Sequence, residues 1–275
     1  MQHGQLNEGD DNMKKWITSV LLVLSAIVLT ACGGAVSEQD KIAQVSADVD
    51  SMIAVQRAVD EYLAETGVLP IKDSELDTDI YIKYQIDFSK LAPKFLAKSP
   101  ANSFEQGGIF QYVLWDVEND PTVKLIDLRI PEKIRELNIR QLSKDYPAFG
   151  AEVGKFVYKI DHETLGFDSE LSVQSSYSTN LLPLVVTGEG EVFVDYTLDL
   201  QQALQMSEGS IAPGEDARNL LITEDSFFLP AYSLPYIVNN RNEIEIAYDA
   251  KASMEEKREK RLEEYEKKQA EQNNH

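Results

Sequence analysis

Apolar residues between positions 40 and 66 recur at alternating spacings of three and four, the period of one face of a helix. The stripe consists of Ile42, Val45, Val49, Met52, Val59 and Leu63, with Gln56 as its one polar interruption. Gly67 suits the residue after a helix, and Pro70 cannot continue one. We therefore expect a long amphipathic helix that packs on a sheet or on another helix, with an oligomer seam as the alternative use of the stripe.

Alternating apolar and polar residues then predict strands in the rest of the first half. At 79–86 the apolar set is Ile80, Ile82, Tyr84 and Ile86. Residues 108–116 and 122–129 form a predicted hairpin around the turn at 118–121, which contains Pro121. A short helical piece at 91–95 and a helix from Pro131 to about Lys144 complete this half.

From Lys155 onward the pattern is β-rich. The predicted strands are 156–160, 171–176, 184–187, 191–200, 220–223, 227–229 and 243–248, with a loop at 207–218. We expect an α+β fold in which a long N-terminal helix packs on an antiparallel sheet. The expected division is a helix-plus-sheet domain at 40–150, a β-rich domain at 151–250 and an exposed charged helix or tail at 251–275.

The N-terminal segment has the order of a secretory signal. Lys14 and Lys15 precede an apolar run from Trp16 to Val28, which at about 13 residues is too short to span a bilayer. Met13 stands directly before the lysines and is the natural start of translation, because residues 1–12 are polar and acidic. We interpret residues 1–31 as a signal peptide and 32–39 as a tether.

The run Leu29-Thr30-Ala31-Cys32 resembles the lipobox of bacterial lipoproteins. The resemblance implies a diacylglyceryl thioether on Cys32 and cleavage after Ala31. Cys32 is the only cysteine of the chain, so no disulfide forms within it. The alternative is a plain signal peptide or membrane anchor with a chance cysteine.

The chain is strongly acidic, with 47 acidic and 26 basic residues and a formal net charge of −21. Nearly all of the excess lies between Cys32 and Ala250, because the segments on either side are close to neutral. Such a body repels nucleic acid and an anionic lipid surface, so the lipid anchor is the expected membrane contact. Cationic partners such as calcium, a basic peptide or a basic protein face stay open, beside solubility alone.

Motifs of catalytic sites are absent from the sequence, and we expect neither catalysis nor a cofactor. His162 lies between two acids just past a predicted strand, where a surface turn is the expected structure. Asp73, Glu75, Asp77 and Asp79 alternate as calcium ligands do in an EF-hand loop. Thr78 and Tyr84 replace the glycine and glutamate of that loop, so these acids are a weak calcium candidate beside a solvated acidic edge.

Two resemblances concern larger parts of the chain. Residues 58–70, 91–94 and 110–113 resemble the globular part of type IV pilins and pseudopilins, which implies a helix on an antiparallel sheet. Filament assembly is not implied, because the apolar segment here precedes a lipobox and is removed. As a whole, the chain is similar to uncharacterised lipoproteins of spore-forming Gram-positive bacteria.

These observations lead to a functional expectation. We expect a non-catalytic lipoprotein on the extracytoplasmic face of the cell membrane, acting as an envelope interaction or accessory protein with a protein partner. A solute-binding lipoprotein of a transporter is the alternative. The sequence does not address the oligomeric state.

Overall fold

The computed structural model describes residues 38–75, 78–144, 147–207, 211–212 and 214–248, with the side chains of 38–47 left out. The predicted signal peptide and C-terminal tail lie outside these residues. The chain divides into two compact units, Met1–Ser51 and Met52–His275. The described part of the first unit is the start of helix α2 (Glu38–Thr66), and every contact below belongs to the second unit.

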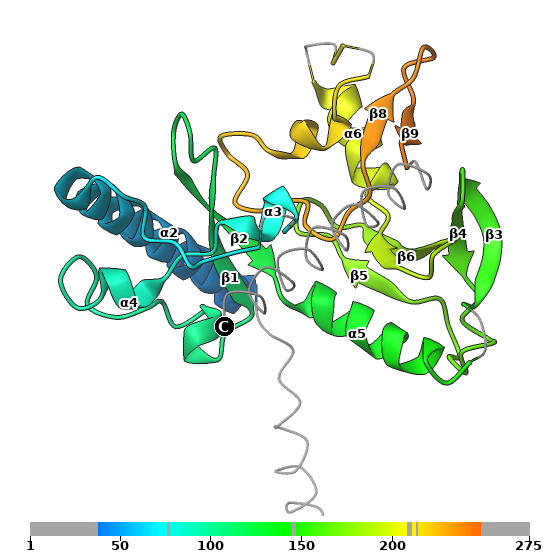
Figure 1. The fold of residues 1–275 in the computed structure, drawn as a ribbon, viewed down its shortest axis with the longest axis horizontal. Coiled ribbons are helices and arrows are strands. Elements are labelled where there is room, and N and C mark those ends of the chain that lie inside the picture. The colour runs from blue at the N-terminus through cyan, green and yellow to red at the C-terminus, as the bar shows by residue number, and fades with distance from the viewer. Residues whose placement is uncertain (1–37, 76–77, 145–146, 208–210, 213, 249–275) are drawn as a thin grey trace, which may run out of the picture. The chain divides into compact units, whose positions relative to one another are not determined.

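The first core forms where α2 meets the hairpin of β1 (Phe110–Trp115) and β2 (Thr122–Asp127). The buried residues of this core are Met52, Val55, Ala58 and Val59 from α2, with Ile86, Phe88, Leu91, Phe110, Tyr112, Leu114, Val123 and Leu125. Helix α2 ends as expected, because Gly67 takes a left-handed φ of 73°. The predicted helix, the predicted hairpin and the packing of one on the other are confirmed (Figure 1).

The strand predicted at 79–86 is wrong for most of its length. Helix α3 (Ile80–Lys83) replaces it, because the Asp79 carboxylate accepts a hydrogen bond from the Tyr81 amide at 2.8 Å and turns the chain. Within the segment 79–86, only Gln85 and Ile86 pair as in a sheet, each in an isolated β-bridge. Helix α4 (Phe88–Leu91) starts in the same way at Asp87, ahead of the helical piece predicted at 91–95. Each of the two short helices is thus capped by its own aspartate.

Helix α5 (Arg129–Gln141) follows the hairpin and packs on the largest sheet. That sheet contains β3 (Phe149–Gly154), β4 (Val157–Ile160), β5 (Ser172–Gln174), β6 (Leu181–Thr187) and β7 (Val192–Val194). Every pairing in it is antiparallel, and β6 pairs with β4, β5 and β7. Strand β3 was not predicted, because five of its six residues are exposed and it contains two glycines.

The strand predicted at 191–200 is correct only for its first part. After β7 the Asp195 carboxylate accepts hydrogen bonds from the Thr197 amide and hydroxyl, and helix α6 (Thr197–Met206) begins. Leu198 is therefore 53% exposed, whereas Leu200 is fully buried. The predicted alternation over Tyr196, Leu198 and Leu200 does not describe this segment.

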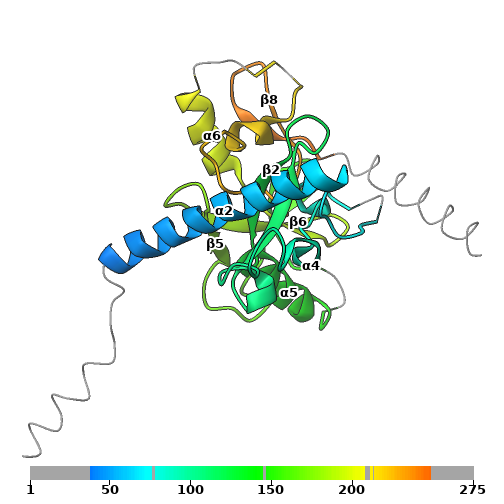
Figure 2. The ribbon, with the colours of Figure 1, turned by 90° about the vertical axis from the view of Figure 1, so that its left-hand side faces the viewer.

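The C-terminal part contains η2 (Ala217–Leu221), β8 (Tyr236–Val238) and β9 (Ile244–Ile246). Hairpin β8–β9 turns at 239–242 as predicted, and α6 lies beside it in Figure 1 and Figure 2. The strand predicted at 220–223 is wrong, since η2 ends within it at Leu221 and the next two residues are irregular. The strand at 227–229 is reduced to one parallel bridge between Leu125 and Phe228.

This bridge joins the C-terminal segment to the N-terminal hairpin. A small core of Tyr81, Val113, Ile126, Leu229 and Ala231 lies beside it. The second large core contains α5, the five-stranded sheet, α6 and hairpin β8–β9. The protein is thus α+β, as expected. Among the described residues, no helix is both long and apolar enough to cross a membrane.

Candidate functional site

Most residues singled out from the sequence do not converge in the structure. Cys32 and Asp77 lie outside the described residues. Asp73 and Glu75 are exposed, and Asp79 caps helix α3. The described residues contain no group of three or more potential metal ligands. The calcium hypothesis therefore stays a prediction.

Asp199 of α6 is the first of two buried charged residues that organise nearby loops. Only 3% of it is exposed. Its carboxylate accepts hydrogen bonds from the Ser175 hydroxyl at 2.5 Å, the Ser178 hydroxyl at 2.7 Å and the Asn180 amide at 2.9 Å. Hydrogen bonds to an ionised acceptor are stronger than those between neutral groups. Asp199 thus binds three side chains of the loop between β5 and β6.

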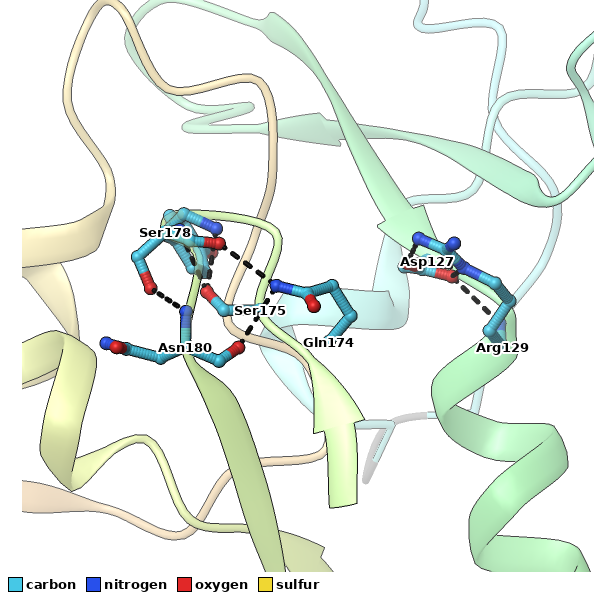
Figure 3. A network of polar contacts seen from close by, with 7 residues as sticks. Asp127, Arg129, Gln174, Ser175, Ser178 and Asn180 are labelled. Carbon is cyan, nitrogen blue, oxygen red and sulfur yellow. Dashed lines mark hydrogen bonds and ion pairs between the residues drawn. The ribbon is translucent and has the colours of Figure 1, made fainter. Parts of the chain in front are cut away.

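The same serines also hold the backbone of that loop. The Ser175 hydroxyl accepts from the amides of Tyr177 and Ser178 at 2.9 and 3.0 Å. The Ser178 hydroxyl accepts from the Asn180 amide at 3.0 Å. Figure 3 shows Gln174 reaching across the turn, where its amide donates to the carbonyls of Ser178 and Asn180. Each of the two serine hydroxyls therefore donates to Asp199 and, through its oxygen, accepts from the backbone of the turn.

Lys124 of β2 is the second buried charged residue, with 4% of it exposed. Its ammonium group donates to the carbonyl of Thr223 at 3.0 Å and to that of Ser226. Burial lowers the pKa of Lys124, and nearby Asp225 opposes this shift. The next residue, Leu125, donates to Phe227 at 2.8 Å and accepts from Leu229 at 3.1 Å. Residues 223–229 are thereby fixed to β2.

A surface pocket of about 440 Å³ lies between these two loops and the end of α6. Its lining consists of Ser176, Tyr177, Ala203, Met206, Ser207, Leu220, Leu221, Thr223, Asp225, Ser226, Phe227 and Phe228. Its size falls within the range of about 300–1,000 Å³ that is usual for ligand pockets. Two walls of this pocket, which we call the α6 pocket, are thus held by Asp199 and Lys124.

Tyr177 connects the α6 pocket to the protein interior. Its ring packs edge-on against Tyr196, with 6.2 Å between centroids. Its hydroxyl is buried and makes no hydrogen bond to any described group. Burial is the main reason that the pKa of Tyr177 lies well above its usual range, with Tyr196 and Asp199 contributing. Tyr177 is therefore a neutral wall residue at physiological pH.

Among the described residues, Asp127 is the other buried carboxylate, and it caps a helix. The Asp127 carboxylate accepts a hydrogen bond from the Arg129 amide at 2.9 Å and pairs with the Arg129 guanidinium at 2.5 Å. Figure 3 shows this pair at the junction of β2 and α5, apart from the serine loop. His162 lies in the turn after β4, as expected. In the described part of the chain, the buried charges form their hydrogen bonds with loops and helix caps.

Sequence reasoning missed the residues of this site. Lys124 alternates with apolar residues and reads as the solvent face of a hairpin, although five of the six residues of β2 are buried. Asp199 lies in a segment that was predicted as a strand. The usable signal was the run Ser175-Ser176-Tyr177-Ser178-Thr179-Asn180, because side chains of this kind hydrogen-bond within turns.

Residues 48–127 match the model of the YphF family N-terminal domain, an uncharacterised family. The match ends with the last residue of β2 and covers the described elements of the first core. Comparison with curated proteins and with solved structures found no match.

Proposed function

We propose that this protein is a non-catalytic lipoprotein, anchored through Cys32 to the extracytoplasmic face of the cell membrane, where it binds a protein partner. The observation that carries the proposal is the placement of the single cysteine directly after the signal-like segment, in Leu29-Thr30-Ala31-Cys32. Two acyl chains on that cysteine provide the stable membrane attachment that one chain does not.

The interior chemistry supports a binding role over a catalytic one. Asp199, Lys124 and Asp127 have their hydrogen-bonding groups directed at loops and caps. Catalysis by carboxylates needs two acids that face one cleft. Among the described residues that line the α6 pocket, Asp225 is the one carboxylate.

The test of the anchor is a Cys32→Ser variant of the full chain in a bacterial host that processes lipoproteins. We expect the unsubstituted protein to incorporate labelled palmitate and to pellet with membranes. The variant should lose the label and retain the mass of the unprocessed precursor, because lipidation precedes cleavage. A variant with unchanged label, mass and membrane residence would refute the anchor.

A solute-binding lipoprotein is the second candidate, and the aromatic lining of the α6 pocket favours it. The antiparallel pairing of the main described sheet speaks against it, because solute-binding lobes commonly repeat a βαβ pattern. A thermal-shift screen of small solutes distinguishes the two candidates. A solute that raises the melting temperature supports the second.

A further inference from the structure

The rim of the α6 pocket carries two large apolar side chains that face solvent. Met206, at the end of α6, is 76% exposed, and Phe227 is 38% exposed. Leu220, Leu221 and Phe228 line the pocket with them. Exposed apolar groups gathered around a hollow mark interaction sites, and methionine adapts its shape to varied partners. The pocket therefore suits an inserted apolar side chain.

The walls of this pocket are set before any partner arrives. Asp199 holds the loop that bears Ser176 and Tyr177, and Lys124 holds the carbonyls of Thr223 and Ser226. Burial of a charge is unfavourable unless it is well hydrogen-bonded, and it fixes the position of the groups that it binds. A pocket that is already ordered loses less entropy on binding than a mobile one.

The charges at the rim favour a cationic neighbour. Asp225 lines the pocket, and Glu224 beside it is exposed. The last turn of α6 has no basic residue to offset the negative end of its dipole. Lys124 contacts its two carbonyls from the interior side of the loop and is not a lining residue. The net charge of the chain, −21, adds a long-range attraction for cations.

We propose that the α6 pocket binds an exposed basic segment of a protein partner, with one apolar side chain in the pocket and a flanking Lys or Arg against Glu224 and Asp225. This inference rests on the proposed function, since it names the binding surface of the accessory protein and the chemistry of its partner. The apolar side chain of the partner is buried in the pocket and supplies affinity. The flanking Lys or Arg gives specificity for basic segments.

The probe is a fluorescent peptide of alternating leucine and lysine, titrated with the purified full chain and followed by fluorescence polarisation. Two matched peptides carry glutamate for lysine or serine for leucine. Met206→Lys places a positive charge at the rim, which repels the lysines of the peptide, and obstructs the pocket. Leu198→Lys, on the same helix and also exposed, lies outside the pocket lining and is the control. Thermal melts show whether both variants remain folded.

We expect the leucine–lysine peptide to bind and the two matched peptides to bind at least about tenfold more weakly, a difference of the size that one buried anchor supplies. Met206→Lys should weaken binding by about tenfold, and Glu224→Gln should weaken it less and reduce its salt dependence. Leu198→Lys should leave binding unchanged.

Two results would overturn the assignment: no saturable binding up to about 1 mM peptide, or equal loss of binding in the Met206 and Leu198 variants. Either result would leave the membrane anchor untouched, because palmitate labelling of Cys32 is measured independently. Conversely, a Cys32→Ser variant that kept its palmitate label, its mass and its membrane residence would refute the proposed anchor without affecting the peptide measurement.

Discussion

Asp199 and Lys124 are charged side chains that lie among apolar neighbours, and each makes its hydrogen bonds to one loop. Gln56 also holds a distant segment, because its side-chain amide donates to the Pro121 carbonyl at 2.9 Å and accepts from the Val123 amide at 2.7 Å. The polar interruption in the apolar stripe of α2 is therefore the residue that holds the start of β2. Single polar residues position the backbone of this protein at several points.

Replacement of Asp199 by alanine should destabilise the protein strongly. It removes the acceptor of two hydroxyls and one amide in a buried place, and we expect a loss of about 3 kcal/mol in the free energy of unfolding. Urea denaturation followed by circular dichroism measures the change. Asp168→Ala, at an exposed position, is the control and should change stability by less than about 0.5 kcal/mol. Equal effects of the two variants would contradict the role of Asp199.

At the scale of elements, the period of apolar residues predicted correctly those helices and strands whose conformation is decided by core packing alone. Helix α2 and hairpin β1–β2 were correct because their patterns are long and their ends carry Gly67 and Pro121. The period failed where one carboxylate decides the local conformation. The carboxylates of Asp79 and Asp195 each accept a hydrogen bond from the backbone amide two residues ahead. A helix therefore starts at each place, although the alternation of apolar and polar residues predicts a strand.

The same scale explains why the candidate site was not predicted. A strand such as β2 that is buried on both faces through contacts distant in sequence does not differ in pattern from an exposed hairpin. Lys124 and Thr223, whose carbonyl it contacts, lie 99 residues apart in the sequence. No local window contains both residues, and the charge alone predicts exposure.

Lys124→Met should release the segment 223–229 from β2 while the cores persist. Methionine fills a similar volume without donating to the carbonyls of Thr223 and Ser226, so we expect a loss of about 1–2 kcal/mol. Hydrogen exchange of the Leu229 amide, which donates to Leu125, should accelerate relative to the amides of β6. Uniform acceleration across both segments would mean global destabilisation instead and would contradict this role of Lys124.

At the scale of the whole molecule, buried tyrosines connect the cores and limit stability at high pH. Burial raises the pKa of Tyr81, Tyr177, Tyr196 and Tyr236 above the ordinary value. Below a pH of about 10 the four phenols are neutral in both the folded and the unfolded state, so their contribution to the free energy of unfolding is complete. It declines as the pH rises above that value, because unfolding then permits ionisation.

We therefore expect phenolate absorbance of the native protein to lag behind that of the urea-unfolded chain as the pH rises. The missing part should appear together with the loss of circular dichroism. The chain has 12 tyrosines, so a lag of the four with a raised pKa is a measurable fraction of the signal. Superimposable titration curves for native and unfolded protein would contradict the burial of these side chains.

The pairing of Leu125 with the segment around Phe228 also has a consequence for folding during synthesis, because the second partner is synthesised long after the first. Helix α2 and hairpin β1–β2 emerge from the ribosome early, but Tyr81, Val113 and Ile126 keep an uncovered apolar face until Leu229 and Ala231 arrive. A chain whose synthesis stopped between Ile126 and Leu229 would expose that apolar face together with the open edge of β2. The segment that contains Phe228, Leu229 and Ala231 must therefore be synthesised before this apolar surface is covered.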